Sequence, residues 1–334
     1  MEEAGMRAIV VKAEGGPEQL VPREYPTPEP GADEILIRVV ATALNRADIQ
    51  QRRGKYPPPA GASPLLGLEI AGTVWEMGGN VTEWEKGQKV YALLTGGGYA
   101  EYAVVHRRLA VPFTDRLSMV EASAVPEAFM TSYQALFWLG QLEAGSNVLI
   151  HAGASGVGTA AIQIARDSGA VVHTTAGSRE KLNFCLQLGA STAINYKEED
   201  FAEKVLQATG GKGVDIIVDF IGAPYWPQNI RALALDGRIV VLATMGGSIV
   251  PDFDIRQLFQ KRGSLITSTL RTRSLEYRTR LSGEFRQYAD ARFNDNRLRP
   301  VVDRVFDWCD VVEAHRYMEE NRNVGKIVLR MNDE

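Results

Sequence analysis

Cysteine is scarce in this sequence: only Cys185 and Cys309 occur among 334 residues. They lie on separate segments expected to be helical, so the sequence supports neither a disulfide framework nor a zinc site of four thiolates. Such sparing use of cysteine is typical of a reducing compartment. We therefore expect a cytoplasmic protein in which both thiols are inert.

Long apolar runs and a strong net charge of either sign are also missing. No run is long enough to span a bilayer, and the acidic segment 1–5 lacks the pattern of a secretory signal. The formal net charge of -4 gives no basic surface for nucleic acid or an anionic membrane. These absences argue against nucleic-acid and membrane partners and leave a small molecule as the expected ligand.

The composition is that of an ordinary globular enzyme, with 45% hydrophobic and 23% charged residues. A chain of this length exceeds what one core usually holds, so two domains are expected. Residues 6–125 are predicted to be mostly β, with proline and glycine between the strands, and residues 126–140 to form a helix.

The most informative stretch is residues 148–165, where a β-branched run enters a turn of small residues and good helix formers follow. Small residues allow backbone N–H groups to approach phosphates, and the positive end of a helix dipole faces the same anions. Gly153, Ser155 and Gly158 occupy the three glycine positions of the dinucleotide fingerprint, from which the serine departs. The residues expected to bind the cofactor here are Gly153, Ser155, Gly156, Val157 and Gly158.

A glycine-rich turn can also simply join a strand to a helix, so the context decides between the two interpretations. Further β-branched runs occur at 171–175, 193–196, 214–219, 238–242 and 264–268. Their alternation with helical or mixed segments is that of a doubly wound parallel sheet. The turn is therefore predicted to bind a dinucleotide.

The segment after the second predicted strand bears on the choice of cofactor. Enzymes that use NAD usually place an acid about 20 residues beyond the glycine turn, but Ser178 stands there, where it also suits a helix N-cap. Lys181 lies three residues into the predicted helix, where the helix dipole disfavours a positive charge. A 2′-phosphate nearby would explain a lysine at this position. Glu180 is a contrary observation, although its position suits a solvated first-turn carboxylate. The charge pattern favours NADPH over NADH.

Six segments spread over nearly the whole chain carry a family resemblance. They are Asn45–Asp48, Gly54–Pro59, Gly67–Gly72, Pro126–Ala128, His151–Gln163 and Lys261–Ser268. In this order they resemble the zinc-independent quinone oxidoreductases of the medium-chain dehydrogenase/reductase superfamily, a group that includes zeta-crystallin. The resemblance implies an α/β protein with a Rossmann NADPH-binding domain of doubly wound parallel sheet, residues 127–269. It also implies a β-rich GroES-like catalytic domain, residues 1–126 with 270–334.

The positions of the superfamily's zinc ligands are altered. The zinc alcohol dehydrogenases carry a histidine where this chain has Leu68 and a cysteine where it has Asn45. Neither replacement is a good zinc ligand, and Glu69 alone cannot hold a metal, so no metal site is expected. Without zinc, the alkoxide that forms during alcohol oxidation is not stabilised. A quinone, by contrast, accepts a hydride with far less polarisation of its carbonyl group. The sequence therefore argues against an alcohol dehydrogenase.

Further cofactor-binding residues are implied by the resemblance and by the ends of predicted strands, where ligands of open α/β sheets collect. They are Thr131, Ser178, Lys181, Tyr196, Ile221, Gly222, Thr244, Met245, Thr267, Ser268, Thr269 and Asn323. In the family, the threonine matching Thr131 faces the nicotinamide, and Tyr196 with the 178–181 segment binds the 2′-phosphoadenosine. In the family, the segment that corresponds to Asn323 lies beside the cofactor. Without the resemblance, Gly325 in the same segment would indicate only a turn before the last strand. Arg271 directly follows a strand expected to line the cofactor.

The catalytic hypothesis is transfer of the NADPH hydride to a quinone, without zinc or flavin and with ortho-quinones as the expected substrates. Asn45 is predicted to hydrogen-bond a quinone carbonyl. Tyr56 is predicted to stack on the ring or donate a proton, or else to form a rigid aromatic wall beside its three prolines. A homodimer is expected from the family, with sheets paired edge to edge and runs 239–242 and 265–268 of suitable strand character.

Two alternatives stay open at the level of sequence. One is reduction of the carbon–carbon double bond of an enone or 2-enal, which uses the same cofactor and hydride geometry. The other is a nucleotide-binding sensor or structural protein with little turnover.

Overall fold

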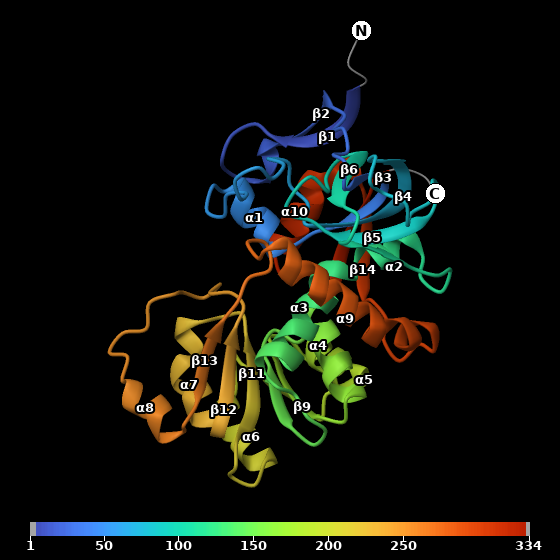
Figure 1. Ribbon diagram of the computed structural model, residues 1–334. Helices are drawn as coiled ribbons and strands as arrows, with labels where there is room; N and C mark the ends of the chain where they lie inside the picture. Colours follow the sequence, from blue (N-terminus) through green and yellow to red (C-terminus); the bar gives the residue numbers. More distant parts are fainter. Residues whose placement is uncertain (1–4, 332–334) are drawn as a thin grey trace. The chain divides into compact units, whose positions relative to one another are not determined.

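The computed structural model describes residues 5–331, and the chain divides into two compact units (Figure 1). One, called the central unit here, is Thr131–Leu270, and the other, called the split unit, combines Met1–Met130 with Arg271–Glu334. Among the described residues no helix is long and apolar enough to cross a membrane.

The central unit is built on a six-stranded parallel sheet with strand order β10-β9-β8-β11-β12-β13. The strands are β8 (Asn147–Ile150), β9 (Val171–Ala176), β10 (Thr192–Asn195), β11 (Val214–Asp219), β12 (Leu233–Val241) and β13 (Ser264–Thr267). The strand order reverses between β8 and β11, which is the doubly wound topology that the sequence predicts. Together with the β-rich split unit described below, this sheet confirms the predicted fold class.

Helices flank this sheet and connect its parallel strands, because parallel strands need a crossover connection (Figure 1). They are α4 (Gly156–Asp167), α5 (Arg179–Leu188), α6 (Phe201–Ala208), α7 (Trp226–Ala232) and α8 (Ile255–Gln260), with a 3₁₀ turn at Ala223–Tyr225. Contacts pair α4 with α5 and α6 with α7. Strand β8, in the middle of the sheet, has a fully buried apolar run of Val148, Leu149 and Ile150, because parallel strands are covered on both faces.

Two predicted elements differ in detail from the structure. The helix expected over 126–140 is α3 (Pro126–Tyr133) followed by a π-helical segment, Gln134–Leu139. The strand expected at 238–242 begins earlier, at Leu233, and bulges before it regains register with β11 at Arg238. Asp236 takes a positive φ of 61° inside this bulge, so the β-branched pattern is interrupted there and the early start is hidden.

The split unit is mainly antiparallel β structure. Its larger sheet has the order β14-β15-β3-β4-β5-β7, with β6 also paired to β3, and β1 and β2 form a separate pair. The strands are β1 (Gly5–Val11), β2 (Leu20–Pro26), β3 (Glu34–Ala43), β4 (Glu69–Met77), β5 (Lys89–Leu93), β6 (Tyr102–His106), β7 (Ala110–Pro112), β14 (Val302–Asp307) and β15 (Lys326–Arg330). The pairing of β15 with β3 joins the last part of the chain to the first.

Short helices and one long helix complete the split unit. They are α1 (Arg46–Arg52), α2 (Met119–Ser123), α9 (Leu275–Asn294) and α10 (Val311–Glu319), with 3₁₀ turns at Pro17–Gln19 and Trp308–Asp310. The core is apolar and draws on both chain segments, for example Ile37, Ile70 and Ile327. Helix α9 buries Leu281, Phe285, Ala289 and Phe293 on one side and carries charged residues on the other.

Candidate functional site

The glycine-rich turn between β8 and α4 is closed by contacts that only glycine permits. A Cβ atom on Gly153 would lie 2.0 Å from Thr174 Oγ1, and one on Gly158 would lie 2.3 Å from the Ala152 carbonyl oxygen. Both distances are far below van der Waals contact, so any side chain there would displace the turn. The first and third fingerprint positions are therefore fixed by packing within the central unit.

Ser155 departs from the glycine fingerprint because it caps helix α4. Its hydroxyl oxygen accepts a hydrogen bond from the Gly158 N–H at 3.0 Å. The N–H groups of Gly156 and Val157 make no hydrogen bond to any residue that the structure describes. Free N–H groups at the first turn of a twelve-residue helix are donors for phosphate oxygens, so the turn fits a dinucleotide.

The ends of β9 and β10 bring hydroxyl and ammonium groups together. Ser178 caps α5 by accepting the Lys181 N–H at 3.4 Å. A Cβ atom on Gly177 would lie 2.8 Å from the Tyr196 hydroxyl and 3.0 Å from Lys197 Cε, which places these side chains beside the turn. Tyr196 and Lys197 are exposed, so both can reach a ligand. Sequence reasoning did not single out Lys197, although it directly follows Tyr196 at the end of a parallel strand.

A buried hydrogen-bond chain fixes the loop after β11. Asp219 Oδ1 accepts the N–H groups of Ile221 at 2.7 Å and Gly222 at 3.2 Å, while its Oδ2 accepts from Asn229 Nδ2 at 3.0 Å. The Asn229 Oδ1 lies 2.8 Å from His151 Nε2, so this nitrogen must carry the hydrogen. Burial lowers the pKa of His151, and the neutral ring holds the predicted cofactor residues Ile221 and Gly222 in place.

The remaining predicted cofactor residues of the central unit follow β12 and β13 or lie on α3. Thr244 and Met245 form an exposed turn, and Met245 donates its N–H to the Phe220 carbonyl at 3.0 Å. Thr267 is the last residue of β13, and Ser268 and Thr269 follow it. Because all six strands are parallel, the structure gathers the residues after these strands at one edge of the sheet.

Thr131 is a buried residue whose hydroxyl has no hydrogen-bond partner among the described residues. A buried hydroxyl without a partner costs free energy, about 1–3 kcal/mol. The unpaired hydroxyl therefore fits the predicted role of Thr131, which is to meet the nicotinamide.

In the split unit, Asn45 belongs to a buried charged cluster with Glu69 and Lys326. The Lys326 ammonium donates to Glu69 Oε1 at 2.6 Å, Asn45 Oδ1 at 2.7 Å and the Leu44 carbonyl at 2.7 Å. The Asn45 Nδ2 donates to Glu69 Oε1 at 2.9 Å and to the Ala43 carbonyl at 3.2 Å. Every hydrogen of the ammonium and both amide hydrogens of Asn45 are therefore in use within the unit.

The second oxygen of Glu69 fixes the start of helix α3. Glu69 Oε2 accepts the Glu127 N–H at 2.8 Å, so the carboxylate joins β4 to α3 as well as to β15. The charges of Glu69 and Lys326 act on the side-chain carboxyl group of Glu127. Burial, with the nearby charge of Glu69, raises its pKa to about 8, and the opposing charge of Lys326 only partly offsets this. Glu127 is thus a carboxyl group that stays largely protonated near neutral pH.

Asp48 extends the same network toward α10. It accepts the N–H groups of Asn45 at 2.7 Å and Gly67 at 3.1 Å, and burial raises its pKa to about 6. The Tyr99 hydroxyl lies 3.3 Å from Asp48 and 3.2 Å from His315 Nε2. Burial and a neighbouring guanidinium lower the pKa of His315 to about 3, so the ring is neutral. These contacts hold α1, and with it Asn45, against the rest of the unit.

Tyr56 is held by Arg271. The guanidinium donates to the Tyr56 carbonyl at 3.2 Å, the Thr95 carbonyl at 2.8 Å and Gln51 Oε1 at 2.6 Å. It also lies 5.0 Å from the centroid of the Tyr56 ring, a cation–π arrangement. Arg271 is buried although it carries a full charge, so its part in the structure is to position the half-buried Tyr56.

Asn323 is engaged in its own turn, where Nδ2 donates to the Gly325 carbonyl at 2.7 Å. The residue of this segment that enters the charged cluster is Lys326, which sequence reasoning did not single out. The one signal was a lysine at the head of a buried strand, since lysine is almost never fully buried unless it is paired. Glu127 was likewise missed, because nothing in its surrounding sequence shows that it lies beside Glu69.

The chain matches two family profiles: "Alcohol dehydrogenase GroES-like domain" over residues 31–115 and "Zinc-binding dehydrogenase" over residues 156–287. It is 31% identical over 334 residues to the quinone oxidoreductase of Homo sapiens, covering 97% of each chain.

Among solved structures, it resembles an NAD-dependent alcohol dehydrogenase with a TM-score of 0.87 and 34% identity, covering 98% of this chain and 100% of that one. It also resembles the CurK enoyl reductase with a TM-score of 0.87 and 29% identity, covering 98% and 99% of the two chains. These findings confirm the resemblance seen in the sequence. The chain belongs to the medium-chain dehydrogenase/reductase superfamily, with the quinone oxidoreductases among its relatives, and is an oxidoreductase of the kind that uses a nicotinamide cofactor.

Proposed function

We propose that this protein is an NADPH-dependent quinone oxidoreductase that works without zinc or flavin. The observation that carries the proposal is the cluster of Asn45, Glu69 and Lys326. A lysine ammonium supplies the positive charge beside Glu69, and Leu68 and Asn45 stand where the superfamily's zinc alcohol dehydrogenases have ligands. A filled, charge-balanced cluster leaves no place for a Lewis acid that would activate an alcohol.

The preference for NADPH is proposed from charge at the ends of β9 and β10. Ser178, Lys181 and Tyr196 stay in the proposed 2′-phosphate site, and Lys197 joins them beside Gly177. An ammonium pairs with a phosphate far better than with a ribose hydroxyl. The likeness to an NAD-dependent alcohol dehydrogenase makes NADH the necessary comparison.

When bound, the nicotinamide supplies a hydride, and the chain's own residues position the reactants. The turn of residues 153–158 is proposed to hold the pyrophosphate, and the unpaired Thr131 hydroxyl to meet the nicotinamide. A quinone that takes up a hydride needs one proton to become a hydroquinone. Tyr56, fixed by Arg271, is proposed to stack on the ring or to donate that proton.

Asn45 enters the proposed mechanism as a positioning residue. A hydrogen bond from its amide to a quinone carbonyl, the role expected from the sequence, would require release of Glu69 or of the Ala43 carbonyl. Its present contacts hold Lys326 and the start of α1 instead. Asn323, whose amide is committed to Gly325, is proposed to shape the segment that precedes Lys326.

The second candidate is reduction of an enone or 2-enal double bond, which the likeness to the CurK enoyl reductase favours. The test is fluorescence titration of wild type with NADPH and NADH, followed by 1,2-naphthoquinone or an enone in the same samples. We expect tighter binding of NADPH and its oxidation by the quinone. A strong preference for the enone would overturn the quinone assignment. Tight binding without oxidation by either acceptor would favour a sensor or structural protein.

We also propose a cytoplasmic homodimer formed through the edge of the central sheet. Within residues 5–331, strand β13 pairs only with β12, and Leu265 on it is 42% exposed. Nearby in sequence, Ile249 is 82%, Ile255 68% and Phe259 79% exposed, which is unusual for such side chains. The free thiols of Cys185 and Cys309 suit a reducing compartment. Sedimentation of wild type and of Phe259→Asp tests the dimer, which the aspartate should dissociate.

A further inference from the structure

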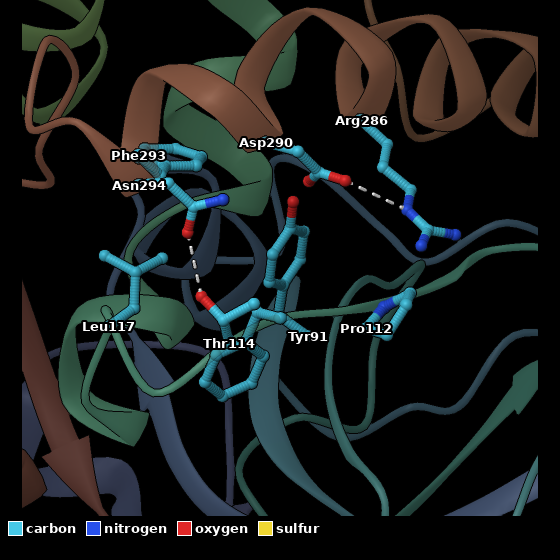
Figure 2. Close-up of a pocket in the computed structure, with 9 residues that line it drawn as sticks. Tyr91, Pro112, Thr114, Leu117, Arg286, Asp290, Phe293 and Asn294 are labelled. Carbon is cyan, nitrogen blue, oxygen red and sulfur yellow. Dashed lines mark hydrogen bonds and ion pairs between the residues drawn. The ribbon is translucent and has the colours of Figure 1, made fainter.

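A hollow of about 160 Å³ lies in the split unit, and none of the residues that line it belongs to the proposed reaction site (Figure 2). We call it the α9 hollow. One side is formed by Tyr91 on β5, by Pro112 at the end of β7 and by lining residues between 113 and 117, and the other by lining residues between 286 and 294 of α9. Segments far apart in the sequence therefore build it, and the core of the unit fixes both sides.

The walls of the α9 hollow are mostly apolar and aromatic. The rings of Tyr91 and Phe113 stack with centroids 6.0 Å apart and planes inclined by 29°. Phe293 packs edge-on against Phe129 in the core, with centroids 5.4 Å apart, and Pro112 and Leu117 complete the wall. An apolar cavity of about 150 Å³ accepts a single benzene ring, so the α9 hollow has room for one aromatic ring.

The inner end of the hollow carries an unpaired hydroxyl. Tyr91 is only 1% exposed, and Figure 2 shows its hydroxyl pointing toward α9 between Asp290 and Asn294. This hydroxyl makes no hydrogen bond to any residue that the structure describes. Burial and the charge of Asp290 hold the pKa of Tyr91 above its usual value, so the group remains a donor. Because this hydroxyl lines the hollow and has no partner in the part of the chain that the structure describes, it is available to a ligand that enters the hollow.

The neighbouring groups define what that partner must offer. Asn294 Oδ1 accepts from the Thr114 hydroxyl at 3.0 Å, which leaves its amide hydrogens for another acceptor. Asp290 Oδ2 lies 3.4 Å from Arg286 Nε, so the two charges nearly cancel. A charged ligand therefore gains little net attraction from this pair, whereas a neutral hydroxyl can accept from Tyr91 or Asn294 and donate to Asp290.

We propose that the α9 hollow is a binding site for a single aromatic ring that carries a hydroxyl group, such as a phenol or a catechol. The ring lies against Phe113, Leu117 and Phe293, and its hydroxyl takes the place of water between Tyr91, Asp290 and Asn294. The proposal does not depend on the proposed oxidoreductase reaction, because none of these residues belongs to the site assigned to it.

The test is a ¹⁹F NMR titration of the full-length protein with 4-fluorophenol, and with fluorobenzene as a probe of equal ring size that lacks the hydroxyl. Tyr91→Phe keeps the ring and removes only the hydroxyl, and Leu117→Phe fills the hollow. Tyr102→Phe, on a half-buried tyrosine of β6, is the matched control. A lost hydrogen bond of ordinary strength predicts an about fivefold rise in the Kd for 4-fluorophenol in Tyr91→Phe. Leu117→Phe should abolish binding, and Tyr102→Phe should leave it unchanged.

Three results would overturn the proposal. The first is no binding of 4-fluorophenol up to its solubility. The second is an equal Kd for fluorobenzene and 4-fluorophenol in wild type. The third is binding that both hollow variants retain but that Tyr56→Ala removes, because the phenol would then occupy the proposed quinone site.

Discussion

The two units hold their proposed ligand-binding residues by different physical means. In the central unit, glycine contacts and helix caps present backbone N–H groups, as at Gly153, Ser155 and Ser178. In the split unit, the corresponding residues sit in a buried cluster of charges, in which Glu69 and Lys326 neutralise one another. The glycine turn depends on backbone packing and needs no charged side chain, whereas the cluster of the split unit depends on charge balance.

This difference indicates how each site fails. A site made of backbone N–H donors is lost when an added side chain displaces the backbone. No change in the charge of a neighbouring group is needed. A site made of buried charges is lost when one partner is removed, because the other remains buried without compensation. The following four predictions test that contrast, beginning with the largest expected effect.

Lys326→Met should destabilise the protein by about 3–5 kcal/mol, because it removes the cation that balances the buried carboxylate of Glu69. The free energy of unfolding is measured by urea denaturation. The double variant Lys326→Met with Glu69→Gln should recover part of the loss, since the buried charge is gone. A loss of less than about 1 kcal/mol in the single variant would mean that the cluster is not charge-balanced by Lys326.

Gly153→Ala should disrupt the glycine turn, because its Cβ would lie 2.0 Å from Thr174 Oγ1 and 3.1 Å from Cys185 Sγ. We expect destabilisation of about 1–3 kcal/mol and loss of dinucleotide binding, measured by denaturation and nucleotide fluorescence. Gly145→Ala is not a suitable control, because its φ is 88°. Gly79→Ala is suitable, since no atom lies within 4 Å of its added Cβ and its φ is not in the left-handed region. Unchanged nucleotide affinity in Gly153→Ala would count against the assignment of the turn.

Glu127→Gln should alter the pH dependence of stability. The pKa of Glu127 is raised from 4.5 to about 8, so between these values the unfolded state has lost the proton that the folded state keeps. Wild type therefore loses stability relative to Glu127→Gln as the pH rises through this window, and the difference levels off above about pH 8. We expect the difference to change by about 1.4 kcal/mol per pH unit between about pH 5.5 and 7.5, measured by urea denaturation. A constant difference across this range would show that Glu127 is ionised throughout.

Lys181→Ala and Lys197→Ala should each reduce the affinity for NADPH about tenfold and leave that for NADH nearly unchanged. Each variant loses one charge-assisted contact with the 2′-phosphate. Lys212→Ala is the matched control, since this exposed lysine lies just before β11, at the opposite edge of the sheet. If NADH binds wild type as tightly as NADPH, the proposed 2′-phosphate site is wrong.

The sequence predicts the central unit well because its signals are local. The glycine turn, the β-branched runs and the caps each lie within a few residues, and the strand order follows from the doubly wound pattern. The serine at position 155 departs from the fingerprint for a local reason that becomes visible only in the structure, its bond to the Gly158 N–H. The early start of β12 was missed because its bulge breaks the pattern of alternation.

The charged cluster of the split unit escaped prediction for the opposite reason. Asn45 and Glu69 are 24 residues apart, and Asn45 and Lys326 are 281 residues apart, so no short motif contains the contact. Only the register of β15 against β3 brings Lys326 to the cluster. The same holds for Arg271 and Tyr56, which are 215 residues apart. Missing zinc ligands were visible in the sequence, but the ammonium that accompanies Glu69 was not.

The late position of β15 in the chain has a consequence for how the protein is made. A ribosome synthesises Asn45 and Glu69 before the central unit, and Lys326 after it. Until that strand emerges, Glu69 lacks the cation of Lys326, and β3 lacks the pairing with β15. The central unit is continuous in sequence and can fold first. Ordered assembly of this kind makes arrival of β15 the step that completes the split unit during synthesis.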